Sequence, residues 1–177
     1  MKKILFPVAV AATLIFSAFT TFNAVNWQIA NGYALKFEGT DAAGGFSKMT
    51  GDIAFDENNL ETAKMAVTID VTSISTGNGM KNGHAKSEKW FNAKQFPTIT
   101  FTSSKFAKIA SGYSVDGTLD LHGVKKPITI PFTFSNNTFK GNFSVNRMDY
   151  GVGTMEGMSK KVSNEIKLDI SVPVTKK

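Results

Sequence analysis

The chain has 177 residues, a formal net charge of +6 and no cysteine. This length suits one domain with a single core. Without cysteine, the sequence excludes disulfides, thiolate metal sites, a cysteine nucleophile and the lipid-modified cysteine of a bacterial lipoprotein. The basic residues are interleaved with acids, so the dense basic stripe that binds nucleic acid is absent from the sequence. We predict no nucleic-acid partner.

The first 24 residues have the layout of a secretory signal peptide. Lys2 and Lys3 precede an apolar run over 4–19, and small and polar residues follow. We place the cleavage after Ala24, although Phe22 departs from the small residue usual at that position; an uncleaved membrane anchor is the alternative. Cleavage removes two lysines and no acid, which lowers the formal charge from +6 to +4. We expect a mature domain over 25–177, periplasmic or secreted.

After this segment, polar and apolar residues alternate with the period of a half-buried strand. Short turns such as DENN and SNNT join most of these runs, which favours an antiparallel sheet. Pro131 falls on a polar face and predicts an edge, a bulge or a bend. The alternation predicts eight strands, over 27–38, 49–56, 62–72, 98–106, 113–121, 126–135, 139–145 and 166–172.

An antiparallel meander with one apolar face per strand folds either as two packed sheets or as a barrel with that face inside. Eight strands is the size at which a barrel is filled by its own side chains or holds one small ligand. We predict an all-β, eight-stranded antiparallel barrel with one short helix between the third and fourth strands. The helix is expected over 83–91, with Asn82 as its cap and Pro97 ending the segment.

Only two histidines are present, so a histidine-based reaction or metal site must use one or both. On the predicted helix, His84 and Glu88 are four residues apart and share a face, as a surface pair or as an oriented imidazole. His122 lies in the turn sequence LHGVKKP. The sequence has no G-x-S-x-G motif, and GVGTMEG lacks the setting of a phosphate-binding loop. We predict no catalytic residue, metal site or cofactor.

Arg147 and Asp149 are predicted to lie on the apolar face of the strand that contains Phe143 and Val145. Charged side chains on an inner face are costly unless they are paired or lie at a wet opening. Two interpretations follow, a structural ion pair at the end of the barrel or polar groups that meet the head of a ligand. A one-residue bulge would instead turn both side chains outward.

Phenylalanine is abundant, with 15 residues against three tyrosines and two tryptophans. Phenylalanine has no polar atom to satisfy, so such a lining suits either a packed core or the binding of a long hydrocarbon or isoprenoid chain. Trp90, Phe91 and Phe96 would close or line one end. The candidate wall residues are Phe37, Phe55, Val67, Ile69, Trp90, Phe91, Phe96, Phe101, Leu119, Phe132 and Phe143, and the candidate head contacts are His84, Arg147 and Asp149.

Five stretches, in this order, resemble the YceI-like family of bacterial proteins: WQIANGYALKF, GGFSKMTGDIAFD, HAKSEKWFNAKQFPTITF, YSVDGTLDLHGVKKPITIPF and FSVNRMDYGVG. The resemblance implies a lipocalin-like barrel of eight strands, a pocket for a polyisoprenoid or isoprenoid quinone, and an exported location. The chain departs from the family pattern in NGYALKF, where many members have a histidine and a serine. The family's helix motif, often H-L-K-S with an aspartate–aromatic pair, survives here as HAKS with EKWF.

The leading hypothesis is a non-enzymatic protein that holds a long apolar amphiphile for carriage, sequestration or stress response. Its partners would be an apolar small molecule or lipid, and a membrane in transient contact. Two alternatives stay open: a lipid-modifying enzyme with His84 or His122 as general base, and a filled barrel that acts as an interaction module.

Overall fold

The computed structural model describes residues 24–154 and 157–177, so the predicted signal peptide lies outside the described residues apart from Ala24. Over this part of the chain the strands are β1 (Asn26–Ile29), β2 (Ala34–Gly39), β3 (Ala42–Phe46), β4 (Met49–Ala54), β5 (Lys64–Asp70), β6 (Ile74–Ser75), β7 (Thr98–Ile109), β8 (Gly112–Leu121), β9 (Val124–Ser135), β10 (Thr138–Asn146) and β11 (Glu165–Lys176). The α-helix α1 (Gly79–Lys86) is accompanied by the 3-10 helices η1 (Leu60–Thr62), η2 (Val71–Ser73), η3 (Arg147–Tyr150) and η4 (Met158–Lys161). None of the helices in the described part is long and apolar enough to cross a membrane.

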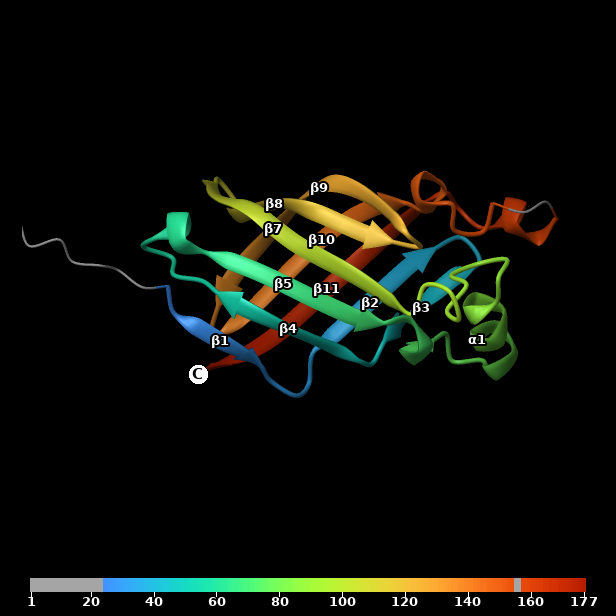
Figure 1. Ribbon diagram of the computed structural model, residues 1–177, viewed down its shortest axis with the longest axis horizontal. Helices are drawn as coiled ribbons and strands as arrows, with labels where there is room; N and C mark the ends of the chain where they lie inside the picture. Colours follow the sequence, from blue (N-terminus) through green and yellow to red (C-terminus); the bar gives the residue numbers. More distant parts are fainter. Residues whose placement is uncertain (1–23, 155–156) are drawn as a thin grey trace, which may run out of the picture.

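Eight strands form a closed antiparallel ring in the order β1, β4, β5, β7, β8, β9, β10, β11 and back to β1 (Figure 1). Closure depends on β1, whose Trp27 pairs with Ile53 of β4 on one side and Lys176 of β11 on the other. A closed ring points one face of every strand inward. The predicted eight-stranded barrel is therefore confirmed.

Three further strands prolong this ring towards α1. β2 pairs with the first half of β11, β3 pairs with β2, and the short β6 pairs with β3. The predicted strand 27–38 is thus two strands, interrupted by a turn. β3 was not predicted, because AAGG carries no large apolar residues to show the alternation. Its glycines are required by close packing, since a Cβ on Gly44 would collide with the carbonyl oxygen of Ser75.

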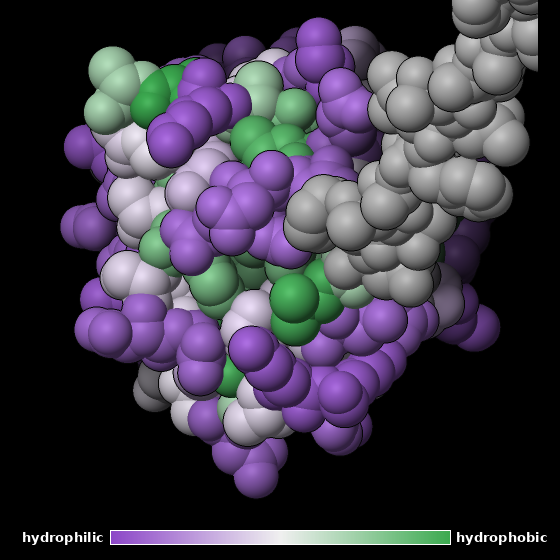
Figure 2. All heavy atoms as spheres, turned by 90° about the vertical axis from the view of Figure 1, so that its left-hand side faces the viewer, coloured by the Kyte–Doolittle hydropathy of each residue, from purple (hydrophilic) through white to green (hydrophobic). Residues whose placement is uncertain are grey.

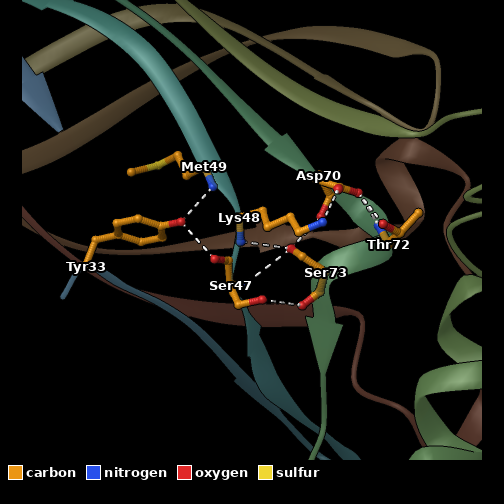
Figure 3. Close-up of polar contacts among 7 residues, drawn as sticks. All are labelled: Tyr33, Ser47, Lys48, Met49, Asp70, Thr72 and Ser73. Carbon is orange, nitrogen blue, oxygen red and sulfur yellow. Dashed lines mark hydrogen bonds and ion pairs between the residues drawn. The ribbon is translucent and has the colours of Figure 1, made fainter. Parts of the chain in front are cut away.

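Side-chain hydrogen bonds form a cluster where the chain passes from one strand to the next (Figure 3). The hydroxyl of Tyr33 donates to the Ser47 carbonyl at 2.8 Å and accepts from the Met49 amide at 2.9 Å. The hydroxyl oxygen of Ser73 accepts from the amides of Ser47 and Lys48 at 3.2 and 3.1 Å. Side chains thus satisfy backbone groups that lose their ladder partners where the strands bend.

Asp70 fixes the exit of the chain from β5 into η2. Its carboxylate accepts from the amide and the hydroxyl of Thr72 at 2.8 and 2.6 Å, and lies 3.6 Å from Nζ of Lys48. The hydrogen bond from the Thr72 hydroxyl has the largest effect and lowers the pKa of the Asp70 carboxyl; burial opposes it, and the Thr72 amide and Lys48 lower the pKa by smaller amounts. The carboxylate therefore stays ionised and caps the turn at neutral pH.

The pairing between β9 and β10 ends close to Pro131. Only residues 132–135 of β9 pair with β10, whereas 124–131 pair with β8 alone. Pro131 has no amide hydrogen, so it stands where no ladder bond towards β10 is needed, in agreement with the edge expected there. Tyr150 of η3 lies beside the unpaired stretch: it is buried, its ring centroid lies 6.0 Å from Nζ of Lys126, and its carbonyl oxygen lies 3.1 Å from Nδ1 of His122.

One end of the barrel is filled by a cluster of aromatic rings around Phe55. Phe55 is fully buried, and its ring centroid lies 5.2 to 5.9 Å from those of Phe106, Tyr113, Phe132, Phe134 and Phe139. Trp27 donates from Nε1 to the Phe55 carbonyl at 2.9 Å. Seen from this end, the surface is mostly hydrophilic, with small hydrophobic patches between polar side chains (Figure 2).

The aromatic cluster should carry a large share of the stability. Phe55→Ala would leave a cavity among five rings, so we expect the free energy of unfolding to fall by about 3–5 kcal/mol. Urea unfolding followed by circular dichroism measures this loss. Ile109→Ala, at an exposed position at the end of β7, is the control and should change the free energy of unfolding by no more than about 0.5 kcal/mol. Equal effects of the two substitutions would contradict the central role of Phe55.

The cluster of hydrogen bonds around Tyr33 and Ser73 gives a second prediction. Tyr33→Phe removes both hydrogen bonds of the hydroxyl and leaves the Met49 amide without its acceptor. The expected loss is about 1 kcal/mol in urea unfolding, with faster hydrogen exchange at the Met49 amide. An unchanged exchange rate at that amide would show that Tyr33 does not hold the bend.

Candidate ligand-binding cavity

The half of the barrel nearer to α1 encloses a cavity of about 750 Å³. This volume lies within the range of small-molecule binding sites. The wall consists mainly of inward-facing aliphatic and aromatic side chains, contributed by strands around the whole ring. Among them are Phe37, Phe46, Val67, Ile69, Phe101, Leu119, Phe132, Phe143, Leu168 and Ile170.

The degree of burial along the strands indicates that this half is hollow. At the end near Phe55, inward-facing residues such as Phe106 and Tyr113 are buried. Towards α1, the inward-facing residues Val67, Leu119 and Phe143 are only partly buried, although they face the same interior. Inward-facing side chains retain exposure only where the interior is not filled. The sheet therefore holds a packed core at one end and a cavity at the other.

Nine of the eleven predicted wall residues line this cavity: Phe37, Val67, Ile69, Trp90, Phe91, Phe101, Leu119, Phe132 and Phe143. The other two do not. Phe55 belongs to the filled end, because strand alternation gives the face of a residue and not its depth along the barrel. Phe96 lies outside the cavity, with its ring centroid 4.6 Å from that of His122.

Phe46 is a wall residue that the sequence did not reveal. It follows the glycines of β3, and its ring meets those of Phe37 and Phe91 at centroid distances of 5.8 and 6.0 Å. The available signal was the weak alternation of Ala42, Gly44 and Phe46. Phe46 connects the strand wall to the segment after α1.

Helix α1 lies at the open end of the barrel and begins earlier than predicted (Figure 1). Its cap is Asn78, whose side-chain oxygen accepts from the amides of Met80 and Lys81 at 2.9 and 3.1 Å. Asn82, the predicted cap, instead accepts from the amide and hydroxyl of Thr76. The helix ends at Lys86, so Glu88 does not share a helical face with His84.

At the end of the barrel near α1, side chains from three segments line the cavity and are also exposed to solvent. They are Asp41 from the β2–β3 turn, Lys81 and His84 from α1, and Lys161 from η4. Because these lining residues are exposed, the cavity reaches the solvent here. We call this opening, between α1, the β2–β3 turn and η4, the mouth.

Arg147 is buried beside the cavity and binds backbone carbonyls. Its Nη1 donates to the carbonyls of Val152 and Gly153 at 2.7 Å, and its Nε and Nη2 donate to those of Ser163 and Val162 at 3.0 Å. Burial lowers its pKa, but an arginine side chain keeps its proton in proteins. Arg147 therefore ties together the two arms of the segment that flanks the mouth.

The predicted pairing of Arg147 with Asp149 on the inner face is wrong. The chain leaves the strand at Asn146 and enters η3, which ends the alternation of faces. Arg147 turns inward, with its guanidinium carbon 5.5 Å from the centroid of the Trp90 ring. Asp149 turns outward, and its carboxylate lies 3.7 Å from Nζ of Lys126.

The packing of Trp90 requires a glycine at position 153. Gly153 has a φ of +65°, and a Cβ there would lie 2.5 Å from the Trp90 ring and 2.9 Å from Nη1 of Arg147. The glycine of the GVG motif thus serves the stacking of Arg147 on Trp90.

A sequence model of the YceI-like domain family matches residues 21–174. The chain belongs to the YceI-like family. This confirms the resemblance found in its five sequence stretches.

Relatives of this YceI-like protein cover most of its length. A UPF0312 protein of Yersinia enterocolitica is 32% identical over 139 residues, which cover 73% of this chain and 71% of that protein. A UPF0312 protein of Yersinia pestis is 30% identical over the same length and coverage.

Solved structures share the fold of this YceI-like barrel. BcnA of Burkholderia cenocepacia superimposes with a TM-score of 0.75 at 28% identity, covering 81% of this chain and 96% of that one. The YceI protein of Campylobacter jejuni gives 0.64 at 27% identity, covering 76% and 84%. A domain of Saccharophagus degradans described as polyisoprenoid binding gives 0.64 at 19% identity, covering 87% and 99%, and shows a common fold.

The role of Arg147 in this YceI-like protein can be tested by substitution. Arg147→Met keeps the apolar stem but leaves at least four carbonyls without their donor. We therefore expect the free energy of unfolding to fall by about 3 kcal/mol. Arg147→Lys should lie between the parent and Arg147→Met, because one ammonium cannot reach all four carbonyls. The measurement is urea unfolding. The exposed Asp149→Asn is the control, and a similar loss in that variant would contradict the assignment.

Proposed function

We propose that this YceI-like protein is an exported, non-enzymatic binding protein that holds a long apolar amphiphile inside the barrel. One observation carries the proposal: apolar side chains that face the interior surround a cavity of about 750 Å³ that reaches the solvent at the mouth. Burial of apolar surface gives about 25 cal/mol per Å², so a chain that fills this space gains affinity by leaving water.

We propose a polyisoprenoid or isoprenoid quinone as the kind of chain. The wall mixes aromatic rings with branched aliphatic side chains, which suits a branched hydrocarbon bound by dispersion and by loss of hydration. The description of the Saccharophagus degradans domain as polyisoprenoid binding supports this choice of ligand, although its likeness to this chain is one of fold. The predicted signal peptide over 1–24 supports export to the periplasm or secretion, and a chain-like lipid supports transient contact with a membrane.

The two histidines favour binding over catalysis. Of the two, His84 lines the cavity, whereas His122 lies outside it, against Phe96 and the carbonyl of Tyr150. A lipid-modifying enzyme would have to use His84 as its base, and α1 ends before Glu88 can orient it. The filled-barrel alternative is disfavoured by the volume of the cavity.

Geranylgeraniol is a suitable probe for this function. At about 100 times its Kd, the ligand should stabilise the folded protein by about 2.7 kcal/mol, which is a shift of several degrees in the thermal midpoint. Phe143→Asp places a charge on the cavity wall and should abolish the shift, because the charge would be desolvated by the bound chain.

Ser144→Asp is the matched control, since Ser144 is the next residue of β10 and is exposed on the outer face. It should bind geranylgeraniol as the parent does. The proposal also predicts that mass spectrometry of solvent extracts from the purified protein finds an isoprenoid. No lipid in the extract, together with no thermal shift of the parent, would contradict the function.

A further inference from the structure

Most charged side chains along the cavity at the end near α1 are basic. Among the described residues they are Lys81, Arg147 and Lys161, against the single acid Asp41. Two of these cations, Lys81 of α1 and Lys161 of η4, stand at the mouth together with His84. α1 and the segment that carries η4 lie at the same end of the barrel (Figure 1).

The cations at the mouth are available for a ligand. Within residues 24–154 and 157–177, the ion pairs involve Lys48, Lys125, Lys126 and Lys177 as cations, and neither Lys81 nor Lys161 is among them. Arg147 differs, because its guanidinium already donates to backbone carbonyls. A polar head at the mouth would therefore meet two lysines, an imidazole and the single carboxylate of Asp41 before it met Arg147.

The position of these groups distinguishes them from ordinary surface lysines. An exposed lysine usually contributes little. Here the two lysines border a cavity with apolar walls. A tail bound in the cavity already holds the head near the mouth, so little additional entropy is lost when the head contacts the lysines. An ammonium group binds an anionic oxygen by a charge-assisted hydrogen bond, which is stronger than a bond to a neutral hydroxyl.

We infer that the amphiphile held by the barrel carries an anionic head, a phosphate or a carboxylate, bound at the mouth by Lys81, Lys161 and His84. This inference rests on the proposed function and names its ligand class more closely. The three side chains set the specificity for the head, and the apolar wall binds the tail.

The same head chemistry has two sources, a free amphiphile or a lipid that remains in a membrane. Met80, which is 75% exposed beside Lys81, gives the mouth an apolar side chain that would touch a bilayer. The inference concerns the head of a molecule whose tail lies in the cavity. Tryptophan fluorescence distinguishes the two sources. Trp90 lines the cavity, so its fluorescence should change only when a tail enters.

The test compares geranylgeranyl phosphate with geranylgeraniol, which share a tail and differ in the head. Binding is followed by tryptophan fluorescence and by the thermal midpoint. We expect the phosphate to bind the parent about 25-fold more tightly, about fivefold for each lysine, and the preference to shrink in high salt.

The double variant Lys81→Gln/Lys161→Gln should lose this preference and bind geranylgeraniol as the parent does. The control is Lys105→Gln/Lys108→Gln, which removes the same charge from exposed positions on β7, away from the residues that line the cavity. This control should keep the preference. His84→Gln should reduce the preference by less than Lys81→Gln/Lys161→Gln does, because glutamine keeps a hydrogen-bond donor.

Each outcome decides the inference. Equal binding of the two probes, or a preference that survives Lys81→Gln/Lys161→Gln, would overturn it while leaving the proposed function intact. Sedimentation with phosphatidylcholine vesicles, with and without phosphatidylglycerol, forms the membrane arm. Binding to anionic vesicles without a head preference and without a fluorescence change would assign the lysines to a membrane surface and also overturn it. Binding of neither probe would contradict the proposed function itself.

Discussion

The pairing of the short strand β1 with both β4 and β11 closes the sheet, and the rest of the structure depends on it. β1 has four residues, yet it joins the two edges of an otherwise open sheet. Trp27 adds a side-chain bond to this closure, since its indole donates to the carbonyl of Phe55. The residue that closes the barrel thus also holds the backbone of Phe55, the centre of the aromatic cluster. An interior surrounded by strands follows from these contacts.

Closure fixes the width of the interior, and the packing of the side chains then decides where it is filled. Large rings around Phe55 occupy the end at which the β7–β8 and β9–β10 hairpins turn. At the other end the strands bend and continue as β2, β3 and β6, and aromatic and aliphatic side chains there line the cavity without filling it. Stability is thereby concentrated at one end, which frees the other to remain hollow.

Alternation along the strands was enough to predict the eight-stranded barrel, because a period of two is a local property of the chain. It could not show depth, so Phe55 and Phe143 looked equivalent although one lies in the core and the other on the cavity wall. The helix cap also depended on distant contacts: Asn78 and Asn82 are both suitable caps, and the bonds between Asn82 and Thr76 decide between them. At Arg147 the alternation ends because η3 begins, which no periodic pattern reveals.

The mouth combines a rigid and an adjustable part. Arg147 makes four bonds to carbonyls from Val152 to Ser163 and stacks on Trp90, so the segment beside the opening is held by a buried charge with its donors engaged. Lys81 and Lys161 are exposed and have long flexible stems, so they can follow a head group without moving the wall. A buried arginine therefore shapes the opening, while in the inferred binding mode the surface lysines contact the head of the ligand. Basic residues at one mouth would then have two roles, Arg147 in holding the structure and the lysines in selecting the head.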